Sequence, residues 1–215
     1  MVVIFTYERL EMLTNLVKEV QKSGHECLVI DDGSSYDWRL MEKLAKKHKF
    51  QAYRTDHNGK TGFYKLWDFA LFILQRKNDD GLPVIFLQDD VSNVDFEAIN
   101  ETHDCFTALN SGAYAAHIIN DGRGPQWTTL NPSPSVLDPY ENVHWIDCIF
   151  FCNRKVFDWI GYDMEIVPIS RFVANKNISS GVGEQFTKRM NRMSIPMCRP
   201  FKSLAYHGDH ESLMH

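Results

Sequence analysis

Two adjacent carboxylates, Asp89 and Asp90, follow directly after a short apolar run at residues 84–87. Each disfavours the ionisation of the other unless a positive charge lies nearby, and a divalent cation is a common partner. Mg²⁺ and Mn²⁺ prefer oxygen ligands and are often held by one or two carboxylates together with substrate phosphates. The pair therefore predicts a metal site. The alternative is that Asp89 caps the next element through backbone donors while Asp90 is solvated.

A second acidic pair, Asp31 and Asp32, follows the apolar run at 27–30 and leads into a Gly-Ser-Ser sequence. Taken alone, this segment is also typical of an ordinary turn, because Asp, Gly and Ser all favour turns. Both pairs, however, end an apolar run, and a basic, Gly-containing loop at 55–62 stands between them in the chain. Together they indicate a ligand site better than either pair does alone.

The elements that must position these acids alternate between strands and helices. Apolar runs rich in β-branched residues predict strands over 2–6, 27–30, 50–54 and 84–87, and apolar residues at helical spacing predict helices over 10–20, 40–45 and 63–77. This alternation is typical of a parallel sheet covered by helices on both faces. In such a sheet the ligand site lies beyond the carboxyl ends of the strands, where both acidic pairs and Thr6-Tyr7 fall.

The second half of the chain has a less regular pattern. We expect helices over 96–109, 155–160 and 183–193, and strands over 113–119, 144–152 and 203–206. Residues 120–142 form a Gly-, Pro- and Asn-rich segment, and a loop of that length in a compact domain is often functional. Asp147 stands within the apolar run at 144–152, where desolvation would suit it to accept a proton.

Length and composition indicate a globular protein with a single core. The chain has 215 residues, 44% of them hydrophobic, which is enough for one sizeable core. No apolar run approaches the roughly 18 residues of a membrane span, so we expect a cytoplasmic protein with no membrane partner, while its oligomeric state is open. The five cysteines form no pattern typical of a zinc site and are expected to be reduced.

The net charge of −5 is unevenly distributed along the chain. Residues 79–147 carry 12 acidic residues and one Arg, whereas residues 151–206 carry nine basic and four acidic residues. Solvated surface explains such an imbalance as well as a cation-binding centre beside a phosphate-binding surface does. One candidate surface for a nucleic acid is the basic segment formed by Lys188, Arg189, Arg192, Arg199 and Lys202.

Seven segments, in chain order, resemble the motifs of glycosyltransferases with the GT-A fold, especially the family 2 type. They are TYER at 6–9, VIDDGSS at 29–35, NGKTG at 58–62, FLQDD at 86–90, FCNRKVFDWIG at 151–161, GEQ at 183–185 and SLAYHG at 203–208. The resemblance spans nearly the whole chain. It implies an α/β, GT-A-like (Rossmann-like) domain over 1–215, with a mostly parallel sheet flanked by helices, a nucleotide-sugar-binding half at 1–92 and an acceptor-side half at 93–215.

The resemblance also implies roles for individual residues. A nucleotide-sugar donor, with a UDP-sugar as the first candidate, is expected to be bound by Thr6, Tyr7, Arg9, Asp31, Asp32 and Lys60. A solvated loop lysine is the alternative for Lys60. A Mn²⁺ or Mg²⁺ ion on the diphosphate is expected to be held by Asp90, with Asp89 as helper and His207 as a further ligand. His207 and His210 together are too sparse a pattern for a zinc site.

Two positions depart from the family pattern. Gln88 replaces the first carboxylate of the fuller metal-binding motif, and Gln185 stands where the family has its catalytic aspartate. An inverting transfer needs a carboxylate near the acceptor hydroxyl as its general base. Asp147 and Glu184 are equal candidates for that catalytic role, although Glu184 also suits a helix N-terminus, so the stereochemistry of transfer is open.

The sequence thus predicts a metal-dependent glycosyltransferase, either a hexosyl- or a pentosyltransferase. A modified base in DNA is one possible acceptor, by analogy with compact phage-encoded transferases, and a saccharide or a small molecule is the alternative. Trp127 in the long loop is expected either to stack on a sugar or base or to pack on its own domain. Gln185 keeps open a noncatalytic nucleotide-sugar-binding module, and a Mg²⁺-dependent phosphohydrolase is disfavoured by Gln88.

Overall fold

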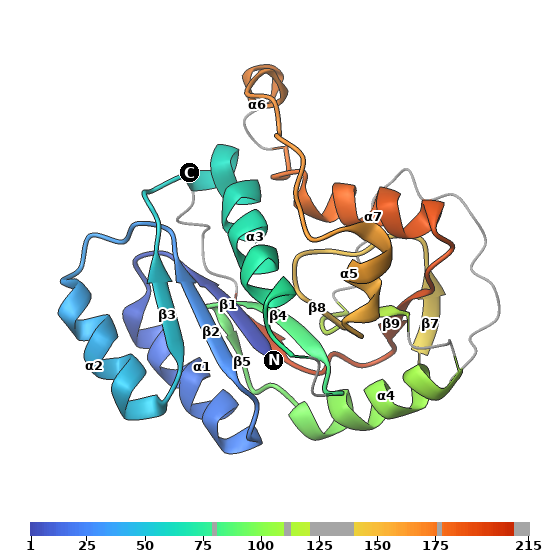
Figure 1. The fold of residues 1–215 in the computed structure, drawn as a ribbon, viewed down its shortest axis with the longest axis horizontal. Helices are drawn as coiled ribbons and strands as arrows, with labels where there is room; N and C mark the ends of the chain where they lie inside the picture. The colour runs from blue at the N-terminus through green and yellow to red at the C-terminus, as the bar shows by residue number, and fades with distance from the viewer. Residues whose placement is uncertain (79–80, 110–112, 121–139, 176–177, 209–215) are drawn as a thin grey trace.

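The computed structural model describes residues 1–78, 81–109, 113–120, 140–175 and 178–208. In the first part of the chain, strands and helices alternate as the sequence predicts (Figure 1). The elements are β1 (Val2–Thr6), α1 (Leu10–Ser23), β2 (Cys27–Asp31), α2 (Trp38–His48), β3 (Gln51–Arg54), α3 (Gly59–Gln75), β4 (Val84–Gln88) and β5 (Val91–Ser92). Gly24 ends α1 in the left-handed conformation, with φ 79°, which glycine adopts without strain.

The second part of the chain completes the sheet and adds helices. Its elements are α4 (Phe96–Leu109), β6 (Ala115–His117), β7 (Tyr140–Val143), β8 (Phe150–Cys152), α5 (Lys155–Ile160), α6 (Ser170–Ala174), α7 (Val182–Arg192), β9 (Met197–Pro200) and β10 (Tyr206–His207). The short helix α6 lies on an excursion of the chain that extends away from the body of the molecule (Figure 1).

Eight strands form one sheet in the order β3-β2-β1-β4-β8-β6-β9-β7. The first four run parallel to one another, so their carboxyl ends lie at the same edge. β8 is antiparallel to β4 and β6, and β7 is antiparallel to β9. β10 pairs with β5 in a separate antiparallel ribbon. The mostly parallel α/β sheet confirms the predicted fold class.

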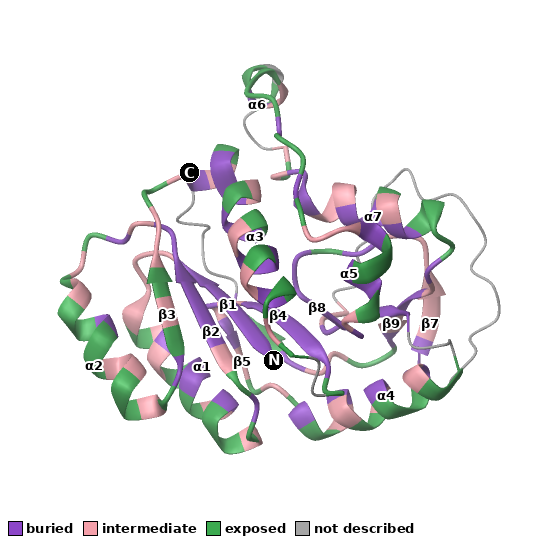
Figure 2. Cartoon of the chain, viewed as in Figure 1, coloured by how far each residue is buried: buried purple, intermediate pink, exposed green. Residues whose placement is uncertain are grey.

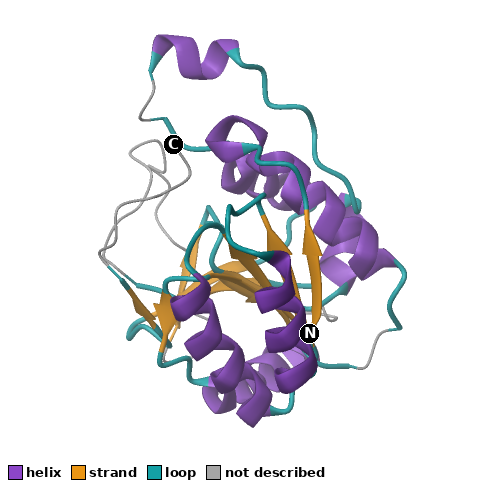
Figure 3. Cartoon of the chain, turned by 90° about the vertical axis from the view of Figure 1, so that its left-hand side faces the viewer, coloured by secondary structure: helices purple, strands orange, loops and turns teal. Residues whose placement is uncertain are grey.

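Alternate residues of the central strand β1 belong to two hydrophobic clusters, one on each face of the sheet. Val3 and Phe5 pack with α3, α5 and α7, whereas Val2 and Ile4 pack with α1, α2 and α4. Because both faces are covered, β1, β2 and β4 are buried almost throughout (Figure 2), which explains their continuously apolar sequences. Figure 3 shows the same helices around the strands from the side.

Trp67 on α3 is fully buried at the centre of an aromatic cluster. Its ring centroid lies 4.7 Å from that of Phe5 on β1, 4.5 Å from that of Phe86 on β4 and 5.1 Å from that of Phe186 on α7. The indole therefore packs the first part of the sheet against a helix of the second part. Its Nε1–H is buried without a hydrogen-bond partner among the described residues.

The structure corrects several boundaries drawn from the sequence. α3 begins at Gly59 rather than at residue 63, because the Asp32 carboxylate accepts hydrogen bonds from backbone N–H groups at its start. The strand expected over 144–152 is limited to β8, and Asp147 lies in irregular chain before it. The strand expected over 203–206 is the short β10 instead. The sequence pattern gives no signal for β9, which is short and ends in Pro200.

Some predictions fall outside the part of the chain that the structure describes. Residues 121–139, which include Trp127, and residues 209–215, which include His210, belong to this group. Among the described residues, no helix combines the length and the apolar character that crossing a membrane requires.

Replacing Trp67 with Ala should lower the free energy of unfolding by about 3–5 kcal/mol, because it leaves a large cavity among the five aromatic rings that surround the indole. Trp67→Phe should cost much less, since it keeps most of the ring contacts and removes an unpaired N–H. Trp159→Ala on α5, where the side chain is 47% exposed, is the matched control. Urea denaturation followed by circular dichroism measures all three, and equal losses for Trp67→Ala and Trp159→Ala would contradict the packing described.

Candidate active site

The strand order brings both acidic pairs next to the end of β1. β1 lies between β2 and β4, with Thr6 in register with Asp31 on one side and Phe5 in register with Gln88 on the other. The ladder continues one residue further on each side, through Asp32 N–H to the Thr6 carbonyl at 3.0 Å and Asp89 N–H to the Phe5 carbonyl at 3.1 Å. The two pairs therefore flank the same loop, as predicted from the strand ends.

Asp89 is buried, with 5% of its surface exposed, and its carboxylate is held by the β1–α1 loop. Oδ2 accepts hydrogen bonds from the Thr6 hydroxyl at 2.8 Å and the Tyr7 backbone N–H at 3.1 Å. Oδ1 pairs with Arg9 Nη1 at 3.3 Å. Burial raises the pKa of Asp89 to about 6, and the bond from Thr6 is the largest of the effects that oppose it.

Asp90 is held by a different arrangement. Its Oδ2 accepts a hydrogen bond from Arg9 Nη1 at 2.7 Å, and its Oδ1 lies 3.3 Å from Nε2 of His207. Burial alone would raise the pKa of Asp90, but His207 and Arg9 outweigh it and hold the pKa below its usual value. The Arg9 guanidinium thus contacts both acids and supplies the positive charge that two adjacent carboxylates require.

His207 reaches Asp90 because β10 pairs with the strand that follows the acids. His207 is in register with Val91 of β5, and the Gly208 N–H donates to the Asp90 carbonyl at 3.1 Å. Asp90 and His207 are therefore in contact, and their role as metal ligands stays a prediction. Asp90 and His207 are 117 positions apart in the sequence, and the pairing of β5 with β10 brings them together.

The chemistry of this donor set fits a divalent cation. Asp90 Oδ1 is buried and receives no well-aligned hydrogen bond from the described residues, and it faces an imidazole nitrogen. A carboxylate oxygen with an imidazole nitrogen suits Mn²⁺ and related ions. Among the described residues, no group of three or more His, Cys, Asp or Glu side chains is placed to hold a metal. A metal here would therefore need oxygen ligands from a substrate or from water.

Asp31 and Asp32 are fully buried, and their carboxylates organise the loops of the site. Asp31 accepts hydrogen bonds from Ser34 and forms an ion pair with Arg54 Nε at 2.6 Å. Asp32 accepts from the N–H groups of Asn58, at 2.8 Å, and Gly59, at 2.9 Å. Both side chains are engaged by their own chain, so their contact with a nucleoside stays a prediction.

The β2–α2 loop and the β3–α3 loop are packed directly against each other. Gly33 adopts φ 71°, and a Cβ atom on it would lie 2.4 Å from the backbone nitrogen of His57, so only glycine fits. The His57 ring stacks on Tyr7 with centroids 4.3 Å apart, and its Nδ1 lies 3.0 Å from the Asp32 carbonyl. Lys60 follows in the first turn of α3, at the same edge of the sheet. Its contact with the donor remains a prediction.

Three residues of this region were missed by sequence reasoning. The guanidinium carbon of Arg54 lies 4.7 Å from the ring centroids of both Tyr36 and Trp38. Its place at the end of β3 is a signal in the sequence that would have identified it. Glu8 has φ 58° and accepts hydrogen bonds from Ser35, which ties the loops after β1 and β2 together. His57 has no signal in the sequence, since its partners are distant in the chain.

Asp147 does not lie in an apolar strand, and the sequence-based reason for its selection is wrong. Its side chain is exposed, and its Oδ1 accepts a hydrogen bond from the Cys148 N–H at 2.6 Å. The segment rests on the start of α7, where a Cβ atom on Gly183 would lie 2.8 Å from the Ile146 carbonyl oxygen. Asp147 is therefore positioned beside the N-terminal turn that carries Glu184.

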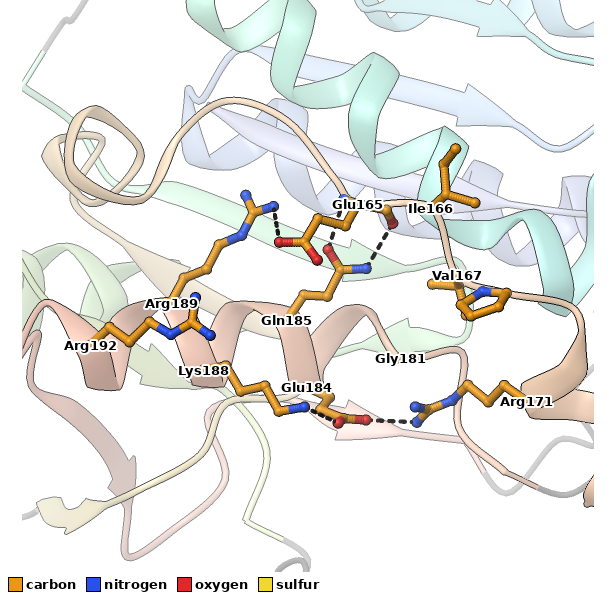
Figure 4. A pocket seen from close by; sticks show the side chains of 11 residues that line it. Glu165, Ile166, Val167, Arg171, Gly181, Glu184, Gln185, Lys188, Arg189 and Arg192 are labelled. Carbon is orange, nitrogen blue, oxygen red and sulfur yellow. Dashed lines mark hydrogen bonds and ion pairs between the residues drawn. The ribbon is translucent and has the colours of Figure 1, made fainter.

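Glu184 is engaged by two cations. Its carboxylate pairs with Lys188 Nζ at 2.6 Å and with Arg171 Nη2 at 2.8 Å (Figure 4). The hydrogen bond from Lys188, the largest effect, together with Arg171 lowers the pKa of Glu184. A carboxylate with a lowered pKa and two cationic partners is a weak proton acceptor.

Gln185 holds the chain segment before α6 against α7. Its Oε1 accepts the Glu165 N–H at 2.9 Å, and its Nε2 donates to the Glu165 carbonyl at 2.9 Å (Figure 4). An aspartate or glutamate at this position could accept but could not donate. Gln185, which the sequence resemblance aligns with a catalytic acid, thus makes a pair of hydrogen bonds that an ionised acid cannot make.

Gln185→Met keeps the length of the side chain and removes both hydrogen bonds, so we expect the segment around Glu165 to open more often. The free energy of unfolding should fall by about 1–2 kcal/mol, and proteolysis within residues 161–169 should become faster. Gln51→Met, at an exposed position of β3, is the matched control. Unchanged proteolysis of Gln185→Met under native conditions would show that the two hydrogen bonds do not hold the segment.

Comparison with known proteins supports the fold assignment. No protein-family model matches the sequence, and no curated protein matches it significantly. The crystal structure of S. aureus TarS 1-349 is similar with a TM-score of 0.57 and 19% identity, covering 96% of this chain and 59% of that one. The crystal structure of glucosyl-3-phosphoglycerate synthase from Mycobacterium tuberculosis, in complex with Mn²⁺ and UDP-glucose, is similar with a TM-score of 0.59 and 12% identity. The match covers 98% of this chain and 71% of that one.

This chain spans about three fifths of the TarS fragment, so it corresponds to only part of that protein. A second TarS structure, in complex with UDP, matches with a TM-score of 0.55 and 17% identity, covering 95% of this chain and 59% of the other. At such low identities the similarity concerns the fold. The chain therefore has the GT-A-like fold that these glycosyltransferases share.

Proposed function

We propose that this protein is a glycosyltransferase that moves a hexosyl or pentosyl group from a nucleotide sugar to an acceptor hydroxyl. The observation that carries the proposal is the cluster of Asp89, Asp90, Arg9 and His207 at the carboxyl ends of β1 and β4. In an open α/β sheet this edge is where ligands bind. The similar structures that bind UDP or UDP-glucose support a UDP-sugar as the donor.

The two oxygens of Asp90 have different surroundings, which suggests how the site holds a metal. Oδ2 is bonded to Arg9, whereas Oδ1 faces His207 and receives no well-aligned hydrogen bond from the described residues. Oδ1 and the His207 Nε2 are therefore the ligands we assign to Mn²⁺ or Mg²⁺. When bound, the metal acts as a Lewis acid on the diphosphate. Asp89 keeps Arg9 and the β1–α1 loop in position.

An inverting transfer also needs a base near the acceptor hydroxyl. The acceptor oxygen bonds to the anomeric carbon while the bond from that carbon to the diphosphate oxygen breaks, and the electron pair leaves with the nucleoside diphosphate. The hydroxyl proton must pass to a carboxylate. Asp147 suits this role better than Glu184, because Asp147 is exposed and Glu184 is held by Lys188 and Arg171.

Several of the basic residues that the sequence offers as a nucleic-acid surface are paired with carboxylates in the structure. Arg199 pairs with Glu141 across β9 and β7, at 2.5 Å, so it is not presented to a nucleic acid in the way the sequence suggests. Lys188 and Arg189 also have carboxylate neighbours. Transfer to a modified base in DNA stays a proposal without a specific contact behind it.

Asp90→Asn should weaken the binding of UDP in the presence of Mn²⁺ by about tenfold or more, because the amide is a poorer metal ligand and loses its pairing with Arg9. Calorimetry with and without EDTA measures this effect, and EDTA should bring the wild type down to the level of the variant. Asp104→Asn on the exposed side of α4 is the control. Unchanged affinity for both Mn²⁺ and UDP in a folded Asp90→Asn would remove Asp90 from the metal site.

Asp147→Asn should lower kcat for sugar transfer by about 10²–10⁴-fold, while leaving the affinity for UDP and Mn²⁺ unchanged, because the base acts on the acceptor. Glu184→Gln should have a smaller effect on kcat. Steady-state release of UDP in the presence of acceptor measures both. A large loss in Glu184→Gln together with normal turnover in Asp147→Asn would reverse the assignment.

A further inference from the structure

The cavity beside α7 has a strongly cationic lining. It has a volume of about 320 Å³ and lies between α7 and the segment that leads into α6 (Figure 4). Four cationic and two anionic side chains line it together with an apolar wall, which gives the lining a net charge of +2. The charged residues are Arg171, Lys188, Arg189, Arg192, Glu165 and Glu184. None of the residues that we assign to the donor or the metal lines this cavity.

The four cations come from two separate elements and differ in their partners. Arg171 projects from α6, and its Nη2 pairs with Glu184, which Lys188 also contacts. Arg189 donates to the carbonyl oxygens of Ile160, at 3.3 Å, and Asp163, at 2.6 Å. It also has two carboxylate neighbours, Asp163 at 3.5 Å from its Nη1 and Glu165 at 3.5 Å from its Nη2. These contacts fix the guanidinium groups in place, so they are arranged before any ligand enters.

Arg192 completes the set from the last turn of α7 (Figure 4). Its side chain is exposed and forms no ion pair with any other described residue. Arg192 also stands four residues after Lys188 on the same helix, an arrangement in which like charges destabilise the helix. The dipole of α7 favours cations in its last turn, but it does not explain Arg171, which faces them from α6. An anion in the cavity would relieve the repulsion from both sides.

The charge and the size of the cavity point to a compact phosphate ester. A phosphomonoester carries a charge of about −1.5 to −2 at pH 7, which matches the net charge of the lining. Arginine binds such oxyanions through two parallel hydrogen bonds. A volume of about 320 Å³ suits one small molecule rather than the extended row of phosphates that duplex DNA presents.

We infer that the acceptor of this enzyme is a small hydroxyl compound that carries a phosphomonoester, and that the cavity beside α7 binds the phosphate. The inference rests on the proposed transferase function and names the class of its acceptor. Arg171 and Arg189 hold the phosphate from the two elements, and Arg192 adds a third guanidinium from the last turn of α7. Asp147 packs beside Gly183 in the first turn of α7, and the next residue of that turn, Glu184, lines the cavity.

The test measures phosphate binding without any donor, so that it does not depend on turnover. By calorimetry, wild type should bind glycerol 3-phosphate and, more weakly, inorganic phosphate, but not glycerol. Arg192→Gln should weaken the binding of both phosphates by about tenfold. Arg39→Gln, at an exposed position of α2, is the matched control and should bind as wild type does. Equal binding of glycerol 3-phosphate by wild type and a folded Arg192→Gln would overturn the inference.

Two further arms separate the possible outcomes. A short DNA duplex, titrated at low salt, should bind no better to wild type than to Arg192→Gln, and tighter duplex binding that Arg192→Gln abolishes would replace the small acceptor by DNA. Titration of UDP with Mn²⁺ tests the transferase proposal separately. If UDP binds and glycerol 3-phosphate does not, the inference about the acceptor fails alone; if the reverse holds, the proposed transferase function fails and the phosphate site stands.

Discussion

The buried charge at the end of β4 is the constraint on which the arrangement of the site depends. Asp89 and Asp90 stand together where the sheet ends, and an unpaired carboxylate in such a place costs several kcal/mol. Arg9 contacts both, while Thr6 and Tyr7 donate to Asp89 and His207 lies against Asp90. The β1–α1 loop must therefore pass directly over the end of β4, which is possible because β1 and β4 are neighbours in the sheet.

A rigid frame on the other side of β1 follows from the second acidic pair. Asp31 holds Ser34 and Arg54, and Asp32 holds N–H groups at the start of α3, so the β2–α2 and β3–α3 loops are joined through two buried carboxylates. Catalytic and binding groups need such support, because a side chain on an unsupported loop is displaced too easily. Asp31 and Asp32 can therefore contribute to ligand binding indirectly, by holding in place the loops that surround the end of β1.

In the second part of the chain, the contacts of Gln185 and Glu184 show what these two side chains do in the folded protein. Gln185 uses both its donor and its acceptor on Glu165, which keeps the segment before α6 in place beside the cationic cavity. Glu184 is neutralised by Lys188 and Arg171. Helix α7 thus has positions that line the cavity, and the proposed base, Asp147, comes from the segment that packs against the start of this helix.

Local sequence pattern was enough to predict the alternating strands and helices, because buried parallel strands must be apolar throughout, and to place both acidic pairs at strand ends. Resemblance to a family indicated Asp90 and His207 as metal ligands. The contact of Arg9 with both Asp89 and Asp90, and the exposure of Asp147, became visible in the folded chain alone. Such contacts depend on strand order and on loop packing, which local periodicity does not encode, so they appear only when the chain is folded.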